Sequence, residues 1–224
     1  MKHLIQTLLL IFLIEGALAQ NNSDTLLSKN GSRVTYHENG RVKTITNYKD
    51  SIKHGPYLEI DEKGNVRTQG NFANDKRHGD YKIFKADGQV IEEYQYYNGI
   101  LDGPSKKYYS NGKIQEESYY VNGSKDQKST WYYLDGNISA EFYYDKGRME
   151  GPQRSYYINN VLRSESSFEN NLQVGDYKEY HENGQLKTEG KFEDGERHGA
   201  WMEYDEAGKL ITKSKYAKGK KAKN

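Results

Sequence analysis

The chain contains no cysteine, only three prolines and almost no surplus of either charge. Without cysteine, a disulfide scaffold, a thiol nucleophile and a thiolate zinc site are all excluded. The 33 Lys and Arg residues stand against 32 Asp and Glu residues, which gives a formal net charge of +1. We therefore expect no nucleic-acid partner, because nucleic-acid binders usually need a basic surplus on one face.

Aliphatic side chains are also scarce. The hydrophobic class makes up 34% of the chain and includes 21 tyrosines, whereas ordinary globular domains reach roughly 45–50%. Such a composition is typical of disordered chains, but disordered chains usually carry a high net charge and few aromatic residues. Here the net charge is close to zero and 13% of the residues are aromatic. Composition alone thus leaves two interpretations open: a disordered chain, or a fold built from tyrosine and glycine.

The N-terminus has the pattern of a secretory signal peptide. A short basic start at Lys2 precedes an apolar stretch over residues 4–14, and Ala17-Leu18-Ala19 supplies a small–x–small cleavage pattern. An apolar helix of this length rises only about 16 Å, too little to cross a bilayer core of about 30 Å. We predict a signal peptide over residues 1–19 and a protein exported to the periplasm, cell surface or medium after cleavage near Ala19.

A 24-residue period fills the rest of the chain. Each repeat is numbered from its first residue, so that position 5 lies five residues after the start. The eight repeats start at Gly31, Gly55, Gly79, Gly103, Gln127, Gly151, Gly175 and Gly199. Position 5 is Tyr, Ile or Phe, position 9 is Gly or Asn, position 11 is Val, Ile or Leu, and position 17 is Tyr or Phe. Five columns in phase indicate a repeat architecture. The predicted organisation is a linker over residues 20–30, eight repeats over residues 31–222, and the end of a lysine-rich tail at residues 223–224.

Each repeat is predicted to form a β-hairpin. Asn39-Gly40 and its counterparts, flanked by β-favouring residues, are strong hairpin signals. A two-residue loop would send Tyr36 and Val42 to opposite faces, whereas a three-residue loop pairs them, so burial favours the three-residue loop. With a period of two, positions 11, 13, 15 and 17 are then expected on one face. The predicted fold is all-β: tandem 24-residue β-hairpin repeats forming a long antiparallel meander of about sixteen strands, an open, twisted sheet.

The repeats resemble the MORN repeat variant found in the YwqK-like antitoxin family. Residues 175–187 (GDYKEYHENGQLK), 189–192 (EGKF) and 195–199 (GERHG) carry the match most clearly. The resemblance implies a β-hairpin repeat fold, and the family label implies neutralisation of a toxin. An exported chain fits poorly with a cytoplasmic toxin. Related MORN repeats imply a role in scaffolding proteins or membranes.

No catalytic or metal site is expected. His54, His78 and His198 share position 23, but equivalent residues of successive repeats lie two strands apart, about 9.6 Å at roughly 4.8 Å per strand. A metal ion needs its ligands at about 2.0–2.3 Å, and no nucleophile elbow or phosphate loop occurs in the sequence. We therefore predict a protein that is not an enzyme and that uses no cofactor.

The middle repeats carry extra aromatic residues at even-numbered positions, and these are the candidate binding residues. They are Tyr109, Tyr119, Trp131, Tyr133, Tyr143 and Tyr157. One hypothesis is an aromatic strip that binds a partner, since large aromatic patches mark recognition surfaces. The other is that these rings are buried, because a sheet poor in aliphatic residues buries whatever rings it has.

A cluster of lysines ends the chain: Lys213, Lys215, Lys218, Lys220, Lys221 and Lys223. This cluster favours a guard against pairing of sheet edges, and contact with anionic lipid or a glycan is the alternative. We expect a non-catalytic, exported protein-binding or envelope scaffolding module. A protein is the favoured partner, a cell-envelope glycan or anionic lipid is possible, and an antitoxin-like protein that neutralises a toxin is the alternative function.

Overall fold

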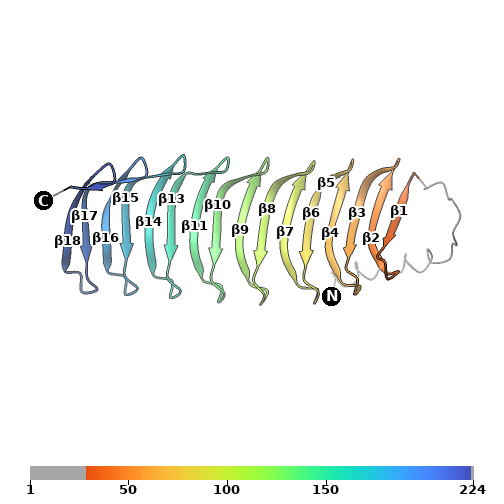
Figure 1. The fold of residues 1–224 in the computed structure, drawn as a ribbon, viewed down its shortest axis with the longest axis horizontal. Helices are drawn as coiled ribbons and strands as arrows, with labels where there is room; N and C mark the ends of the chain where they lie inside the picture. The colour runs from red at the N-terminus through yellow and green to blue at the C-terminus, as the bar shows by residue number, and fades with distance from the viewer. Residues whose placement is uncertain (1–28, 223–224) are drawn as a thin grey trace.

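The structure is a computed structural model that describes residues 29–222. The predicted signal peptide, most of the predicted linker and the last two residues lie outside the described residues. The described chain forms one elongated sheet in which the repeats follow one another from β1 at one end to β19 at the other (Figure 1). No helix occurs within residues 29–222, and thus none long and apolar enough to cross a membrane.

Nineteen antiparallel strands make up this sheet. Consecutive strands pair with one another, except that β5 and β6 both pair with β4, and β12 and β13 both pair with β11. The strands are β1 (Gly31–Tyr36), β2 (Val42–Lys49), β3 (Ile52–Ile60), β4 (Val66–Ala73), β5 (Lys76–Arg77), β6 (Gly79–Phe84), β7 (Val90–Tyr97), β8 (Ile100–Tyr108), β9 (Ile114–Val121), β10 (Ser124–Tyr132), β11 (Ile138–Asp145), β12 (Arg148–Met149), β13 (Gly151–Tyr156), β14 (Leu162–Glu169), β15 (Leu172–Tyr180), β16 (Leu186–Glu193), β17 (Glu196–Tyr204), β18 (Leu210–Ala217) and β19 (Lys220–Lys221). The open antiparallel meander of hairpins confirms the predicted fold class. The expected count of about sixteen was too low, because β5–β6 and β12–β13 are each one interrupted strand and β19 adds a short last one.

The first turn of each repeat is the predicted three-residue loop. In repeat 1 the His37 N–H donates to the Arg41 carbonyl at 2.8 Å, and the Gly40 N–H donates to the His37 carbonyl at 3.0 Å. Tyr36 pairs with Val42, as predicted. Gly40 has a φ of 78°, and Asn160, which replaces glycine in repeat 6, has a φ of 65°. Position 9 of the repeats is restricted to Gly and Asn because these residues adopt the left-handed region of backbone conformation at low cost.

The second turn of each repeat is a two-residue hairpin loop. Tyr97 pairs with Ile100, and the two residues between them, Asn98 and Gly99, have φ values of 49° and 86°. A type I′ turn requires positive φ at both central residues, which explains the Asn-Gly and Asp-Gly pairs at these positions. The turns are also joined to one another: the Gly99 N–H donates to the Arg77 carbonyl of the preceding repeat at 2.8 Å.

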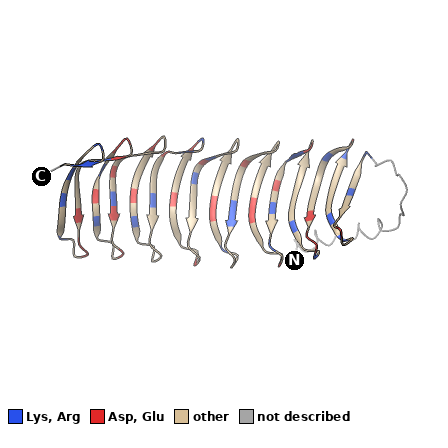
Figure 2. Cartoon of the chain, viewed as in Figure 1, with Lys and Arg blue, Asp and Glu red and all other residues tan. Residues whose placement is uncertain are grey.

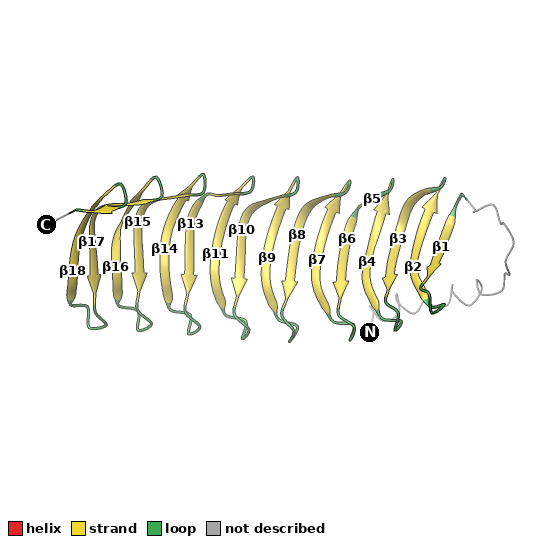
Figure 3. Ribbon diagram, in the orientation of Figure 1, coloured by secondary structure: helices red, strands yellow, loops and turns green. Residues whose placement is uncertain are grey.

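A bend occurs at the start of every repeat. The seven glycines at position 0 have φ values from 69° to 123°, and Gln127 in the same column has a φ of 62°. Around Gly55 the pairing steps from Tyr48↔Lys53 to Thr46↔Tyr57, so β3 contains extra residues that its partner β2 lacks. A bulge of this kind bends and twists the strand. The individual strands are curved, and this holds from one end of the sheet to the other (Figure 3).

A second bulge overturns one prediction about the faces of the sheet. Tyr36 pairs with Val42 but Thr35 pairs with Thr44, so Lys43 is an extra residue between the two pairs. The prediction that the position-5 ring shares a face with position 11 holds, whereas its extension to positions 13, 15 and 17 is wrong. It assumed an uninterrupted period of two, and one inserted residue shifts everything beyond it to the other face.

The ladder face, as we call it, carries positions 1, 3, 5, 14 and 16. Lys106 pairs with Glu93 across the junction between repeats 3 and 4. Tyr108 lies two residues beyond Lys106, and its hydroxyl donates to the Glu93 carboxylate at 3.0 Å. The position-5 ring thus lies beside the acidic column at position 14.

The ring face, on the other side, carries positions 2, 4, 13, 15 and 17 and holds the core. Tyr81 is 6% exposed and Trp201 is 2% exposed. Both rings pack over a glycine of the preceding repeat: an added Cβ at Gly70 would lie 2.2 Å from the Tyr81 ring, and one at Gly190 would lie 2.3 Å from the Trp201 ring. Each large ring therefore fills space that the neighbouring repeat leaves open.

Cationic side chains cover the ring face at its edge. The Arg77 guanidinium lies 4.5 Å from the centre of the Tyr81 ring and 5.4 Å from that of Tyr96. Arg197 lies 4.1 Å from the Trp201 ring centre. Each such contact is worth about 0.5–1 kcal/mol or more when it is shielded from water. The core therefore depends on rings and cations in place of aliphatic layers.

Gln127 is expected to destabilise the bend that glycine makes in the other repeats. An L-residue in the left-handed region costs roughly 1–2 kcal/mol, so Gln127→Gly should raise the free energy of unfolding by about 1 kcal/mol. Urea unfolding followed by circular dichroism measures the change. Gln69→Gly, at an exposed strand position, is the matched control and should destabilise the protein. A loss of stability in Gln127→Gly would contradict this explanation of the bend.

Gly190→Ala should be costly, because the new methyl group collides with the buried Trp201 ring. Overpacking of this kind costs typically about 1–3 kcal/mol. Ser166→Ala tests the same position in repeat 6, where a side chain is already present, and should change stability by less than about 0.5 kcal/mol. Equal effects of the two substitutions in thermal unfolding would show that the glycine does not serve ring packing.

Candidate interaction surfaces

Three of the six candidate rings form a row along the edge of the first turns. The Tyr109 hydroxyl donates to the Tyr132 carbonyl of the next repeat at 2.6 Å. Tyr133 donates to the Tyr156 carbonyl at 2.7 Å, and Tyr157 donates to a carbonyl of repeat 7 at 2.9 Å. These rings are half-buried. Their hydroxyl groups are used within the protein, so the row offers ring surface to a partner and little free hydroxyl chemistry.

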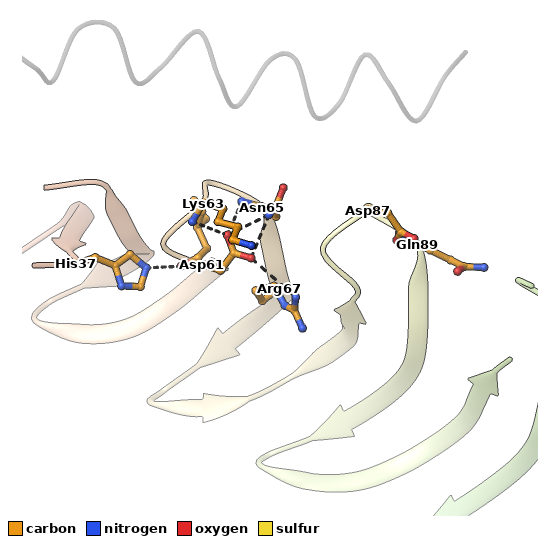
Figure 4. Close-up of polar contacts among 8 residues, drawn as sticks. His37, Asp61, Lys63, Asn65, Arg67, Asp87 and Gln89 are labelled. Carbon is orange, nitrogen blue, oxygen red and sulfur yellow. Dashed lines mark hydrogen bonds and ion pairs between the residues drawn. The ribbon is translucent and has the colours of Figure 1, made fainter. Parts of the chain in front are cut away.

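Outer repeats make the same bridge with histidine. His37 Nε2 lies 2.7 Å from the Ile60 carbonyl, and Figure 4 shows the His37 ring pointing toward the turn that carries Asp61. In repeat 2 the position is Asp61, whose carboxylate accepts from the N–H groups of Lys63 and Asn65 at 3.0 and 2.9 Å. The hydrogen bond from Asn65 is the main cause that lowers the pKa of Asp61. Asp61 therefore stabilises its own turn.

The other three candidate rings lie elsewhere. Tyr119 and Tyr143 are on the ladder face, where they pair with Pro104 and Lys128. Trp131 is on the ring face at position 4, with the Lys125 ammonium 5.6 Å from its ring centre. The structure thus brings Tyr109, Tyr133 and Tyr157 together and separates the remaining three, because the bulges change which even-numbered positions share a side.

Sequence reasoning missed two exposed aliphatic residues beside this row. Leu134 and Ile158 occupy position 7 of repeats 5 and 6, and each is 56% exposed. Four other repeats carry glutamate at this position: Glu38, Glu62, Glu182 and Glu206. A comparison of turn tips across the repeats could have found them. We call Tyr109, Tyr133, Leu134, Tyr157 and Ile158 the turn-edge patch.

The ladder face carries a row of charged contacts that we call the ladder. Its ion pairs lie within single repeats, and its tyrosine–glutamate hydrogen bonds join neighbouring repeats. The Lys82 ammonium lies 2.7 Å from Glu93, and Lys106 lies 2.8 Å from Glu117. The Tyr132 hydroxyl donates to the same Glu117 at 2.7 Å. Both signs of charge are distributed along the whole sheet (Figure 2).

These contacts shift the pKa values of the glutamates and the tyrosines. Burial alone would raise the pKa of Glu93, but the hydrogen bonds from Lys82 and Tyr108 outweigh it and lower that pKa. For Glu117 the hydrogen bond from Lys106 is the largest cause and lowers its pKa. Burial, followed by the bond to Glu93, raises the pKa of Tyr108 to about 12. The ladder is therefore most stable when its carboxyl groups are ionised and its phenols are neutral.

One carboxylate is buried in the ring face. Glu116 is 4% exposed. It accepts hydrogen bonds from Ser118 at 2.8 Å and Lys125 at 2.5 Å, and Lys107 lies 3.4 Å away. Burial would raise the pKa of Glu116, and the bond from Lys125 is the first of the contacts that lower it instead. Since its charge is matched by two lysines, Glu116 has the environment of a structural ion cluster.

The acidic residues at position 23 cap turns. Asp102, Asp126 and Glu150 accept from the backbone N–H groups of Asn122, Lys146 and Asn170 in the following repeat, at 3.2, 3.1 and 2.9 Å. Among the residues that the structure describes, no group of three or more His, Cys, Asp or Glu side chains could hold a metal ion.

These features define a class: an open β-hairpin repeat protein in which each repeat contacts its neighbours. The profile of the MORN repeat variant matches six segments that together span more than half of the chain: residues 29–50, 77–98, 101–122, 149–170, 173–194 and 197–218. The chain belongs to the MORN repeat variant family. The two windows between these segments, in repeats 2 and 5, fold into the same pairs of strands.

Solved structures give only distant similarity, and no curated protein matches. The GtfA/B complex bound to UDP and GlcNAc is 13% identical, with a TM-score of 0.23, over 64% of this chain and 24% of that chain. A mutant of S. aureus TarM in complex with fondaparinux is 10% identical, with a TM-score of 0.26, over 71% of this chain and 25% of that chain. The TcdB2-TccC3-Cdc42 complex is 12% identical, with a TM-score of 0.23, over 82% of this chain and 11% of that chain. The chain spans a quarter or less of the length of these three structures.

Acidification should weaken the ladder. A lowered pKa in the folded state stabilises the protein above the unfolded value of about 4.3, and that contribution is lost as the pH falls through the folded-state pKa. Replacing Glu93, Glu117 and Glu141 by Gln should therefore flatten the fall in urea midpoint between neutral pH and pH values below about 4. The matched control replaces the exposed turn-tip residues Glu38, Glu62 and Glu182 by Gln and should leave the slope closer to that of the wild type. Identical slopes for both triple variants would contradict the ladder's role.

Proposed function

We propose that this repeat protein is a non-catalytic binding module that acts after export and holds a protein partner on its turn-edge patch. Membership of the MORN repeat variant family supports a role in binding. The observation that carries the proposal is the pair Leu134 and Ile158, each 56% exposed at neighbouring turn tips where other repeats carry glutamate. Contiguous exposed apolar residues are typical of sites for protein partners.

The neighbouring rings strengthen this surface. Tyr109, Tyr133 and Tyr157 are each fixed by a hydrogen bond to the next repeat. A side chain that is already held in place loses little entropy when a partner binds. The patch therefore offers a rigid row of rings with two aliphatic side chains beside it, which suits a protein surface with an apolar centre.

Export and the identity of the partner belong to the same proposal. The signal-peptide pattern over residues 1–19 supports action in the cell envelope or outside the cell. There the module would scaffold an envelope protein, and a glycan or anionic lipid is a further candidate ligand for the half-buried rings and the C-terminal lysines. The antitoxin-like alternative uses the same surface, since a rigid row of this length could cover the active face of a toxin.

Leu134→Ser together with Ile158→Ser should abolish partner capture and leave the fold intact. Both side chains are exposed, so the free energy of unfolding should change by less than about 0.5 kcal/mol for each substitution. The measurement is photo-crosslinking in cells from a residue placed at position 110, the exposed turn tip of repeat 4, followed by identification of the adduct by mass spectrometry.

The chain offers a matched control in Leu210→Ser with Ile211→Ser, which removes two other exposed aliphatic residues, 47% and 65% exposed, in repeat 8. The control should keep the adduct. If the control variant loses the partner as completely as the test variant, the turn-edge patch is not the binding surface. If the adduct forms with a lipid or glycan in place of a protein, the proposed partner class is wrong.

A further inference from the structure

Within this chain, the tyrosine hydroxyl at position 5 occurs together with a glutamate of the preceding repeat. At five junctions between repeats a glutamate at position 14 accepts a hydrogen bond from the tyrosine at position 5 of the next repeat. The pairs are Glu93–Tyr108 at 3.0 Å, Glu117–Tyr132 at 2.7 Å, Glu141–Tyr156 at 3.0 Å, Glu165–Tyr180 at 3.1 Å and Glu189–Tyr204 at 2.7 Å.

The other two junctions have neither group. Position 14 is Ile45 in repeat 1 and Gln69 in repeat 2, and the residues that follow at position 5 are Ile60 and Phe84. At the junctions between repeats, a ring with a hydroxyl therefore occurs only where a carboxylate precedes it. The hydroxyl at position 5 thus serves to reach the acid of the neighbouring repeat.

Tyr36 is the exception to this rule. It carries the hydroxyl at position 5 of repeat 1, where no earlier repeat supplies a carboxylate, and its side chain is 53% exposed. Among the described strands, β1 pairs only with β2, so its other edge has no strand partner there. The N-terminal edge of the sheet thus presents one half of a contact that is completed at five other places.

We propose that the open edge of β1 binds an acidic β-strand of another protein, whose carboxylate accepts the hydrogen bond of Tyr36. The register follows from the junctions inside the chain, where Glu189 pairs with Met202 at position 3. The equivalent of Met202 in β1 is Val34, so the incoming carboxylate lies opposite Val34. Addition of a strand to an exposed sheet edge is a common mode of peptide recognition.

The composition of β1 favours this mode. The strand reads Gly-Ser-Arg-Val-Thr-Tyr and contains no Pro or Lys, the residues with which proteins usually protect an exposed edge. Arg33 is its one charged residue, and its guanidinium lies over the Tyr48 ring at 4.0 Å. A positive charge at the edge attracts an acidic strand, and a charge-assisted hydrogen bond is about twice as strong as a neutral one.

A second copy of this chain does not supply the missing strand. At the opposite end of the sheet, position 14 of repeat 8 is Lys213, which would face Tyr36 with an ammonium group. In repeat 7, Arg197 lies over the Trp201 ring of the next repeat. The equivalent residue of repeat 8 is Lys221, and the equivalent of Trp201 in repeat 1 is Arg33, so two positive charges would meet. Ala207 replaces the asparagine that in repeat 7 donates to the Glu206 carbonyl at 2.9 Å. Each of these changes removes a contact between repeats, so the occupant is a different protein.

Synthetic peptides test the proposal. The probe is residues 185–195 of this chain, the strand that carries Glu189, and the control peptide has Glu189→Lys. Titration of each into the purified protein, followed by NMR, should shift the amide signals of residues 31–36, with the lysine peptide binding at least about tenfold more weakly. Tyr36→Phe should reduce the difference between the two peptides, because only Glu189 uses the hydroxyl. Equal affinities of the two peptides, shifts confined to other strands, or no binding of either would overturn the proposal.

A second measurement uses no peptide. Lys213→Glu gives the chain's own C-terminal edge the acid that β1 is proposed to bind. This variant should associate end to end, at concentrations where the wild type is monomeric, in sedimentation velocity runs, and Tyr36→Phe in the same chain should reverse the association. A Lys213→Glu chain that stays at the wild-type size at every concentration would contradict the role of Tyr36. The turn-edge patch is not involved in either measurement, so failure here leaves the proposed function standing.

Discussion

The contact between one repeat and the next is the interaction on which the whole structure depends. A single hairpin of this composition buries almost nothing by itself: within the described residues only Tyr81 and Trp201 are buried hydrophobic side chains, and each packs over a glycine of the preceding repeat. The tyrosine–glutamate hydrogen bonds, the bridges from one first turn to the next and the hydrogen bonds between second turns all cross the same junctions. The free energy of unfolding of such a chain is approximately the sum of the contributions of the single repeats and of the contacts between neighbouring repeats.

Left-handed backbone positions make these junctions possible. Gly55 and its counterparts bend each first strand, and the bulge beside Val42 moves the position-5 ring to the ladder face. Without the second bulge, the tyrosine and the glutamate of one repeat would lie on opposite faces, and the contacts between successive repeats could not line up on a single face. The many glycines therefore specify shape, and their entropy cost in the unfolded chain is offset by contacts that no other residue would permit.

Much of this fold could be predicted from the sequence, because the glycine and tyrosine columns fix the period, the hairpins and the three-residue loop at Gly40. The faces could not, because a bulge such as the one at Lys43 leaves no mark in a pattern of apolar residues. For the same reason the six candidate rings did not form one strip: Trp131 lies on one face while Tyr119 and Tyr143 lie on the other. Leu134 and Ile158 were overlooked because isolated exposed aliphatic residues are common on protein surfaces, and they stand out only against the glutamates of other repeats.

Truncation by whole repeats tests the dependence on neighbours most directly. Chains ending after repeat 2, 4, 6 or 8 would be unfolded in urea, and both the midpoint and the slope of unfolding recorded. If the junctions hold the structure, the shortest chain is unfolded and stability rises with each added pair of repeats, because every pair adds two junctions. A stable two-repeat chain, or a midpoint that does not depend on the number of repeats, would contradict the account.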